Sequence, residues 1–514
     1  MVASAQKSTP VTLGRAAAQR SFADGPTAAA IDRSAQTTLT PDLCIIGAGS
    51  GGLSVAAAAA SLGVSVVLIE KHKMGGDCLN SGCVPSKALI AAAKSAQQAR
   101  ASAAFGIEAR EPVIDFKQVS RHVQGAISAV APNDSVARFT ALGVKVVQGA
   151  ARFVDSRTVE AGEVLIRARR FVIATGSSPA MPAIPGLENV PYLTNETVFN
   201  LDQPVGHLLV IGGGAMGVEL AQAYRRLGAK VTLFEQGQVL GREDAELSAV
   251  AVRRLQREGV VIHAGCMVRK IESRAGAIEL QFGETAGSDT GVQLRGVAGT
   301  HLLIAAGRKP NIDGLGLAAA KVQTGAQGIV VNRGLVTSNR RVFAIGDVIG
   351  GAQLTHAANY HAGIVIQRAL FRLPRKINIA AIPRVTFTDP EIAQTGMTEA
   401  EARMTRRKIS IYRWPFSEND RARTELSAEG LIKIVCDGRG RILGAGIAGP
   451  QAGELIQLWT LAIAQKLKIG AMTQWIAPYP TLGEVSRRAA FAAMAAKARH
   501  PAVQMLLSLL RKFG

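Results

Sequence analysis

Two copies of one local pattern constrain the fold of this 514-residue chain more than any other feature. In each copy an apolar run enters a glycine-rich turn, a helix-like stretch follows, and a second apolar run ends at a glutamate. The copies run from Gly47 to Glu70 and from Gly212 to Glu235, so the glutamate follows the first glycine by 23 residues in both. This arrangement is typical of a β-α-β unit that binds a dinucleotide. The repeat therefore predicts an α/β fold with two Rossmann-like dinucleotide-binding domains.

The three glycines and the acid of each unit have different physical roles. The first glycine permits a tight turn, the second lets the backbone approach a pyrophosphate, and the third lets the helix pack closely against the strand. The carboxylate accepts hydrogen bonds from a ribose, and the helix N-terminus favours the negative pyrophosphate. The residues concerned are Gly47, Gly49, Gly52 and Glu70 in the first unit, and Gly212, Gly214, Gly217 and Glu235 in the second.

Two cysteines five residues apart, Cys78 and Cys83, predict redox chemistry. On an ideal helix their Cα atoms would lie about 8 Å apart, beyond the roughly 7 Å limit for a disulfide. The turn over residues 80–82 must therefore be irregular, and its small residues suit this role. Pro85 starts the following helix, which leaves Cys83 at a helix N-terminus, where a thiolate is favoured. A static disulfide and a zinc site are the alternatives, but a zinc site needs more ligands than His72 supplies, so we expect no resident metal.

Composition agrees with a large enzyme. With 48% hydrophobic residues and a mean hydropathy of +0.18, the chain can form about three or four domains. No stretch is long and apolar enough for a transmembrane helix, so we expect no stable membrane insertion. The three remaining cysteines, Cys44, Cys266 and Cys436, are expected to be buried thiols, which favours a reducing, cytoplasmic location. Organellar import through residues 1–40 is the less favoured alternative.

The net charge of +21 raises the question of a nucleic-acid partner. The arginines occur as separated doublets, such as Arg225-Arg226 and Arg406-Arg407, without a contiguous basic block. Aromatic residues make up only 4% of the chain, so few side chains could stack on nucleic-acid bases. We therefore expect no nucleic-acid binding, and a basic surface that attracts anionic substrates and nucleotides.

The run from Gly75 to Lys87 resembles the redox-active segment of the class I pyridine nucleotide-disulfide oxidoreductases, the flavoenzyme family of dihydrolipoamide dehydrogenase, glutathione reductase and mercuric reductase. The resemblance implies that Cys78 exchanges with substrate and that Cys83 is the thiolate beside the flavin. It also implies FAD at the first dinucleotide unit and a nicotinamide nucleotide at the second. The carboxylate of Glu235 would repel a 2′-phosphate, which favours NADH over NADPH, although Arg242 follows closely in the sequence.

The resemblance also implies the reaction. NADH reduces FAD, FAD reduces the disulfide between Cys78 and Cys83 through Cys83, and the dithiol reduces a small-molecule thiol or disulfide acceptor, as in dihydrolipoamide dehydrogenase. A metal-ion or quinone reductase similar to mercuric reductase is the alternative. A flavoprotein without turnover, acting as a redox sensor or a binding partner, is a third reading, which the two intact cysteines disfavour.

Further site residues follow from the resemblance alone. For FAD they are Gly47, Gly49, Gly52, Glu70, Lys71, Gly76, Asp77, Lys87, Ala151, Thr175, Gly176, Ser177, Asp347, Leu354, Thr355 and His356. For the nicotinamide nucleotide they are Gly212, Gly214, Gly217, Glu219, Glu235, Val268 and Gly307. Lys87 and Glu219 are expected to form an ion pair near the flavin; a solvated lysine and a surface glutamate are the alternative. Asp347 is expected at the flavin ribityl chain, with a simple turn residue as the alternative.

The resemblance divides the chain into consecutive parts and implies a homodimer. We expect a flexible extension (1–40), an FAD-binding domain with the cysteine pair (41–190), an NAD(P)-binding domain (191–311), a return to the FAD or central domain (312–378), an α+β dimerisation domain (379–500) and an amphipathic tail (501–514). In relatives the last domain of one subunit completes the disulfide site of the other. The tail is expected to pack on the dimer in preference to anchoring in a membrane.

Tyr479 is the main departure from the family pattern. Dihydrolipoamide dehydrogenases and glutathione reductases have an acid-base histidine there, oriented by the glutamate that corresponds to Glu484. A phenol with a pKa of about 10 is ionised to only about one part in a thousand at neutral pH, and losing a general base typically costs about 10²- to 10⁴-fold. Mercuric reductases carry tyrosine there, yet they also carry a C-terminal cysteine pair, and residues 485–514 contain no cysteine. The acceptor therefore stays open.

Overall fold

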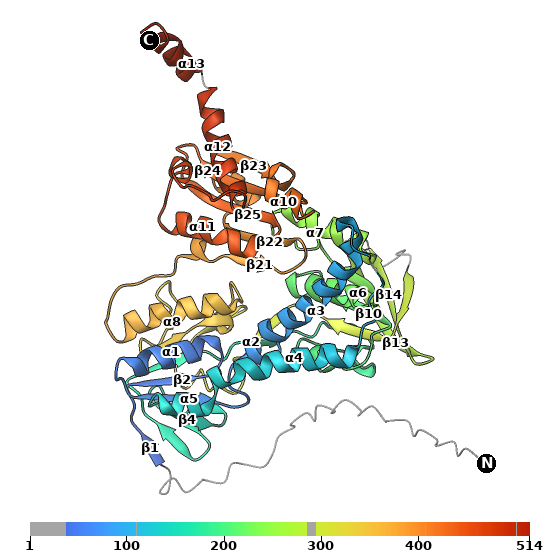
Figure 1. The fold of residues 1–514 in the computed structure, drawn as a ribbon. Coiled ribbons are helices and arrows are strands. Elements are labelled where there is room, and N and C mark those ends of the chain that lie inside the picture. The colour runs from blue at the N-terminus through green and yellow to red at the C-terminus, as the bar shows by residue number, and fades with distance from the viewer. Residues whose placement is uncertain (1–36, 109, 285–293, 407, 500, 514) are drawn as a thin grey trace, which may run out of the picture.

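The computed structural model describes residues 37–108, 110–284, 294–406, 408–499 and 501–513. Its first large element is a parallel five-stranded sheet with the strand order β20-β8-β2-β3-β4. The strands are β2 (Leu43–Ile46), β3 (Val66–Glu70), β4 (Lys145–Gln148), β8 (Arg170–Ile173) and β20 (Val342–Ala344). Helices α1 (Ser50–Ser61) and α8 (Thr355–Ala369) lie side by side over this sheet (Figure 1). The strands of the second sheet lie between β8 and β20 in the sequence, so the chain returns to the first sheet after it has formed the second.

The second sheet is also parallel and has the order β12-β11-β10-β16. Its strands are β10 (His207–Ile211), β11 (Lys230–Glu235), β12 (Val260–Ala264) and β16 (His301–Ile304), accompanied by helices α6 (Ala215–Arg226) and α7 (Ala245–Arg257). An antiparallel sheet of β13 (Cys266–Arg274), β14 (Ala277–Glu284) and β15 (Arg295–Gly299) lies beside it. The two strands of each glycine-rich unit are therefore neighbours in one parallel sheet, β2 and β3 in the first and β10 and β11 in the second.

The third large sheet is antiparallel, with the order β21-β22-β25-β24-β23. Its strands are β21 (Arg384–Thr386), β22 (Glu391–Gly396), β23 (Ile409–Pro415), β24 (Leu431–Asp437) and β25 (Ile442–Gly449), and its main helices are α9 (Glu399–Thr405), α10 (Asp420–Thr424), α11 (Ala452–Ala464) and α12 (Glu484–Ala498). A last helix, α13 (Pro501–Leu510), projects beyond α12 at the end of the chain (Figure 1). The chain is therefore a mixed α/β protein with an α+β C-terminal part, as the sequence predicted.

One boundary expected from the sequence differs from the structure. Residues Thr37–Leu39, assigned to the flexible extension, form strand β1, which pairs in parallel with β7 (Val164–Ile166). The four-stranded sheet that results is completed by β6 (Val159–Ala161) and β5 (Ala151–Phe153). A strand of three residues is too short to show an alternating pattern, which is why the sequence did not reveal it. Residues 1–36 of that extension lie outside the described residues.

The two glycine-rich units repeat each other in atomic detail. The first glycines, Gly47 and Gly212, have φ angles of +102° and +112°, which side chains disfavour. A Cβ added to Gly52 would lie 1.9 Å from the carbonyl oxygen of Gly47, and a Cβ added to Gly217 would lie 1.9 Å from that of Gly212. Both turns therefore require glycine at the first and third positions, because of conformation in one case and contact in the other.

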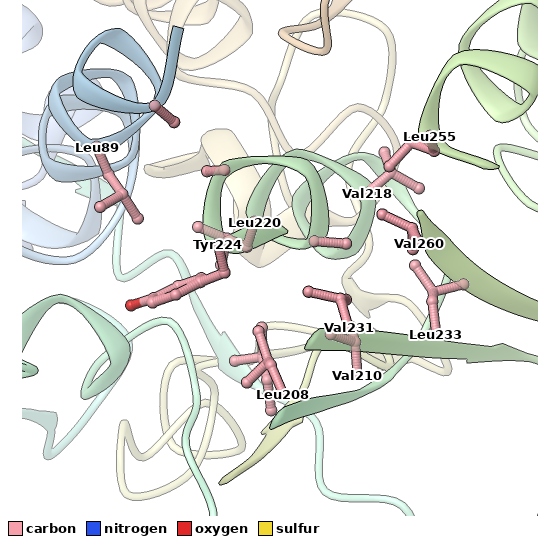
Figure 2. Packing of buried hydrophobic residues seen from close by; sticks show 14 of the residues in the cluster. Leu89, Leu208, Val210, Val218, Leu220, Tyr224, Val231, Leu233, Leu255 and Val260 are labelled. Atoms are coloured by element: carbon pink, nitrogen blue, oxygen red, sulfur yellow. The ribbon is translucent and has the colours of Figure 1, made fainter. Parts of the chain in front are cut away.

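A hydrophobic core joins the helix that follows the cysteines to the second parallel sheet. Figure 2 shows Leu89 of α3 (Cys83–Ala101) approaching the side of α6 that carries Leu220 and Tyr224. Beneath α6, Leu208 and Val210 of β10 point toward the same helix (Figure 2). The helix that begins at the redox cysteine is thus held against the part of the chain that contains the second glycine-rich turn.

Buried charges join the second sheet to the C-terminal part. The ammonium of Lys433, on β24, lies 3.0 Å from Asp244 Oδ2, 3.1 Å from Glu246 Oε2 and 2.7 Å from Glu399 Oε2. Lys433 and Asp244 are both buried, so removing one partner would leave an uncompensated charge in a poorly solvated place.

Among the residues that the structure describes, no helix is both long and apolar enough to cross a bilayer.

We expect Gly217→Ala to lower the free energy of unfolding by about 1–3 kcal/mol, because the new methyl group forces the glycine turn apart. Urea denaturation monitored by circular dichroism measures this change. The matched control is Gly125→Ala in α4 (Phe116–Val130), where an added Cβ meets no atom within 4 Å. That control should be neutral or stabilising by up to about 1 kcal/mol. Equal stability of the Gly217 variant and wild type would contradict the packing argument.

Candidate active site

The residues expected to bind FAD gather at one edge of the first sheet. Gly47, Glu70 and Thr175 lie at or just beyond the carboxyl ends of β2, β3 and β8, and Asp347 follows β20 in a 3-10 helix, Gly346–Ile349. Because the strands are parallel, these ends meet at the same edge, which is where open α/β sheets bind nucleotides. Leu354 precedes α8, and Thr355 and His356 begin it.

Two members of the expected FAD set differ in burial, since the side chain of one lies in the core and that of the other is exposed. Ala151, the first residue of β5, is 8% exposed, and its side chain belongs to a hydrophobic core cluster. Lys71, directly after Glu70, is exposed. Only the backbone of Ala151 is available to a ligand.

The residues expected to bind the nicotinamide nucleotide gather in the same way at the second sheet. Gly212, Gly214 and Glu235 lie at the carboxyl ends of β10 and β11, and Gly307 follows β16. Val268 is different, since its side chain is 6% exposed and packs in the core between β13 and the second sheet.

The acidic residues of the two units are held by the same hydrogen bonds. Glu70 accepts from the backbone N–H of Ala48 at 2.7 Å and of His72 at 2.8 Å. Glu235 accepts from the corresponding groups, the N–H of Gly213 at 2.7 Å and of Gly237 at 2.8 Å. Both carboxylates are therefore fixed at the mouth of their glycine turn before any ribose arrives.

The chain breaks its helix between the two cysteines. Helix α2 (Gly76–Asn80) contains Cys78, and α3 begins at Cys83, two residues before Pro85. Both cysteines are free thiols, with Cys78 half-buried and Cys83 exposed. A Cβ added to Gly82 would lie 2.8 Å from the carbonyl oxygen of Asp77, so glycine lets the chain fold back over α2. The irregular turn predicted from the spacing is confirmed.

The two thiols have opposite pKa shifts. The hydrogen bond from Cys78, assisted by Thr355 and the positive charge of Lys87, lowers the pKa of Cys83 to about 6, even though partial desolvation of its sulfur by neighbouring atoms opposes this. The same hydrogen bond and burial raise the pKa of Cys78. Thr355 Oγ1 lies 3.3 Å from Cys83 Sγ, and the N-terminus of α3 also favours a negative sulfur. At neutral pH the reduced pair is therefore a Cys83 thiolate that accepts a hydrogen bond from a Cys78 thiol.

Lys87 and Glu219 form the ion pair expected from the sequence pattern. Lys87 Nζ lies 2.9 Å from Glu219 Oε2, and Glu219 is buried on α6. Phe387, just after β21, donates its backbone N–H to Glu219 Oε1 at 2.9 Å, and its ring centroid lies 4.2 Å from Lys87 Nζ. The pair is therefore enclosed by a residue from the C-terminal part of the chain.

Three residues that sequence reasoning missed hold this region together: Asn195, Arg308 and Phe387. Asn195, which is 1% exposed, donates to Asp77 Oδ1 at 2.8 Å and to the carbonyl oxygen of Ser81 at 3.1 Å. These bonds connect Asp77, just before Cys78, to Ser81, between the two cysteines, and so hold the turn in place. No local pattern marks Asn195, because its partners are more than a hundred residues away in sequence.

Arg308 connects the cysteine segment to the other expected FAD residues. It lies 2.6 Å from Asp77 Oδ2 and donates to Ser177 Oγ at 2.7 Å. Ser177 in turn donates to Asp347 Oδ2 at 2.7 Å. Burial raises the pKa of Asp347, although Ser177 and Arg308 oppose this shift. Arg308 directly follows Gly307, which the sequence analysis assigned to the nicotinamide nucleotide, but nothing in the sequence indicated which residues its side chain contacts.

Tyr479 and Glu484 are not brought to the cysteines of their own chain. Tyr479 is 70% exposed and donates its hydroxyl to Asp420 Oδ2 at 3.2 Å, within the C-terminal part. This hydrogen bond and the negative charge of Asp420 raise the pKa of Tyr479. Glu484 is the first residue of α12. A phenol held in this way keeps its proton at neutral pH.

Comparison with known proteins decides the family. A profile described as pyridine nucleotide-disulphide oxidoreductase matches residues 41–362, and the profile of the dimerisation domain of these enzymes matches residues 382–490. The chain belongs to this family of pyridine nucleotide-disulphide oxidoreductases. The predicted family, fold class and enzyme class are confirmed, and so is the use of FAD with a nicotinamide nucleotide. The dimerisation domain supports a homodimer.

Individual relatives carry two different activities in their names. A mercuric reductase from Streptomyces lividans is 37% identical over 466 residues, which cover 87% of this chain and 95% of that relative. A dihydrolipoyl dehydrogenase from Geobacillus stearothermophilus is 33% identical over 465 residues, covering 88% and 95%. The Cu(II) complex of the HOCl-induced flavoprotein disulfide reductase RclA from Escherichia coli has a TM-score of 0.77 at 26% identity, covering 87% of this chain and 98% of that one.

The residues at the first sheet fit the FAD that this oxidoreductase family requires. A Cβ added to Gly49 would meet only Gly76 Cα, at 3.9 Å, and a Cβ added to Gly76 would lie 2.8 Å from Gly49 Cα. The backbones of Gly49 and Gly76 therefore lie side by side with no side chain between them. This leaves their N–H groups open to a pyrophosphate, which side chains at these positions would exclude. Glu70 stands ready for a ribose at the same edge.

We expect alkylation of Cys83 in the reduced protein to rise with pH around a midpoint near 6, because only the thiolate reacts. In Cys78→Ala the hydrogen bond to the thiolate is lost, so the midpoint should rise by about one unit or more. Iodoacetamide labelling with assignment of the modified cysteine by mass spectrometry measures both. Cys44→Ala, which removes a fully buried thiol on β2, is the control and should leave the midpoint unchanged. A wild-type midpoint near the ordinary thiol value of about 8.5 would refute the assignment.

Proposed function

We propose that this protein uses NADH to reduce the disulfide between Cys78 and Cys83 through FAD, and that Cys78 passes the electrons to a thiophilic acceptor. The observation that carries this proposal is the unequal thiol pair, with the pKa of Cys83 lowered to about 6 and that of Cys78 raised. An exposed thiolate at a helix N-terminus and a neighbouring protonated thiol can act as separate partners for a cofactor and a substrate.

The roles of the chain's own groups follow from their contacts. FAD, when bound, supplies the two-electron relay between nicotinamide and sulfur. Cys83 holds negative charge beside Thr355, and Lys87 stabilises that charge electrostatically. Cys78 keeps the proton of the reduced pair, and Asn195 and Arg308 keep the turn that joins the two sulfurs in place through Asp77. Oxidation of this pair, one thiolate and one thiol, to the disulfide releases two electrons and one proton.

The acid at the second glycine turn supports NADH as the coenzyme. Both oxygens of Glu235 are fixed by backbone N–H groups, so the carboxylate cannot easily turn away from a 2′-phosphate. A phosphate at that position would meet a negative charge at close range, whereas a 2′-hydroxyl could donate to it.

We expect a higher kcat/KM for NADH than for NADPH, and a preference at least about tenfold smaller in Glu235→Ala, since that variant removes the repulsion. Steady-state oxidation of each coenzyme with one fixed acceptor measures the ratio. Glu163→Ala, which changes an exposed glutamate beside the small sheet of β5, β6 and β7, is the matched control. A wild-type preference for NADPH would contradict the coenzyme assignment.

Among thiophilic acceptors, the contacts of Tyr479 favour a soft metal ion. Exchange with a disulfide requires a base that takes the proton from Cys78, and a phenol whose pKa is raised by Asp420 is a poor base. A soft metal ion displaces the thiol proton itself by binding sulfur. The two electrons of the dithiol would reduce one Hg(II) to Hg(0), or two Cu(II) to two Cu(I). The mercuric reductase relative and the Cu(II) complex of RclA support this choice.

A dihydrolipoyl dehydrogenase-type reaction is the second candidate, because relatives with that name are 33–35% identical over most of the chain. We expect NADH oxidation by wild type with Hg(II) or Cu(II) to exceed that with lipoamide, and Tyr479→His to raise lipoamide turnover by about 10- to 100-fold by restoring a base. Stopped-flow and steady-state assays of one preparation with each metal, lipoamide and a quinone make the comparison.

Two further variants make the acceptor test decisive. Cys78→Ser should abolish metal and lipoamide turnover alike, while Tyr479→Phe should leave lipoamide turnover as low as in wild type. Wild-type turnover of lipoamide that matches the metal rate would overturn the choice of acceptor. Loss of metal turnover in both Tyr479→His and Tyr479→Phe would instead give the phenol a direct role.

A further inference from the structure

The C-terminal helix α13 exposes an apolar surface outside the body of the protein. None of the ten residues of α13, all of which the structure describes, is buried. Met505, Leu506 and Leu510 are 73%, 53% and 54% exposed, and Phe513 beyond the helix is 81% exposed. The helix projects past the end of α12, away from the three large sheets (Figure 1). Large side chains are seldom exposed so densely without a partner surface.

The polar side of α13 is turned back toward α12. Gln504 and Ser508 are four residues apart, so they share one face of the helix, and Arg511 follows directly after its end. The amide of Gln504 donates to the carbonyl oxygen of Ala498, at the end of α12, at 2.6 Å. The apolar residues occupy the remaining face, and Met505, Leu506, Leu509 and Leu510 are each more than half exposed. The helix therefore exposes a broad apolar face that a partner surface could cover.

Charge identifies the kind of surface that this face fits. Residues 485–514 contain six basic residues and no aspartate or glutamate, within a chain of net charge +21. The basic residues are Arg487, Arg488, Lys497, Arg499, Arg511 and Lys512. A second copy of the segment would bring the same charges and repel it. A surface that is both anionic and apolar, such as a bilayer with acidic headgroups, complements it.

We propose that α13 binds peripherally to the surface of an anionic lipid bilayer. Its apolar side would lie at the boundary between headgroups and acyl chains, with Arg499, Arg511 and Lys512 at the level of the headgroups. Ten helical residues extend about 15 Å, roughly half of the hydrocarbon thickness of about 30 Å, so the helix lies in the surface and does not span it. The inference is independent of the acceptor, because α13 lies beyond α12, away from the two sheets that carry the nucleotide units (Figure 1).

Vesicle sedimentation of the full-length holoenzyme tests the proposal. Wild type should sediment with vesicles of phosphatidylcholine and phosphatidylglycerol and much less with phosphatidylcholine alone, and binding to the anionic vesicles should fall as salt rises. The double variant Leu506→Gln and Leu510→Gln should bind anionic vesicles at least about tenfold more weakly, because it removes buried apolar area. Its charge equals that of wild type, so attraction by a basic surface alone would leave its binding intact.

Controls separate the lipid surface from other occupants. Ser508→Gln, on the polar side of α13, should bind vesicles like wild type. Sedimentation velocity and NADH oxidation should be unchanged in the double variant, since the changed residues are exposed. Equal vesicle binding by the double variant and wild type, or absence of binding by wild type, would overturn the proposal. Dissociation of the dimer in the double variant would overturn it too, and would make a second copy the occupant of this face.

Discussion

The close passage of the chain at Gly82 over α2 is the constraint on which the redox site depends. An added Cβ there would lie 2.8 Å from the carbonyl oxygen of Asp77 and 3.2 Å from Cys78 Cα. This passage ends one helix and starts the next, so that Cys83 occupies a helix N-terminus while its sulfur stays within hydrogen-bonding reach of Cys78. A continuous helix would separate the two sulfurs and leave both with ordinary acidity. The unequal pKa values of the pair are therefore a consequence of backbone geometry.

Distant parts of the chain hold that passage in place. Asn195 and Arg308 both bind Asp77, and each comes from a segment outside the first sheet. Hydrogen bonds to a charged group contribute about 1.5–3 kcal/mol each, which is enough to order a turn of three residues. The core between α3 and α6 adds a second support, because Leu89 packs with the helix that follows the second glycine turn. The two nucleotide units thus act as a frame for the sulfur pair between them.

Local pattern explains how much of this was visible in the sequence. The glycine turns, their acids and the break between the cysteines all depend on residues within about two dozen positions of each other, so their spacing predicted them. Asn195 and Phe387 reach partners 118 and 168 residues away, and an isolated asparagine or phenylalanine carries no periodic signal. The three residues of β1 were too few to show alternation. Tyr479 stood out as a departure from the family pattern, but its partner Asp420 did not, because only the fold brings the two together.

A chain of contacts links the C-terminal part to the thiolate. The backbone N–H of Phe387 donates to one carboxylate oxygen of Glu219, and the ammonium of Lys87 donates to the other. Lys87 also lowers the pKa of Cys83, so its ammonium is shared between a carboxylate and a sulfur. A carboxylate turned away from Lys87 would leave more of the positive charge to the thiolate, whereas a closer one would leave less. Because Phe387 fixes the carboxylate, the position of the dimerisation domain contributes to the acidity of a cysteine three hundred residues earlier in the chain.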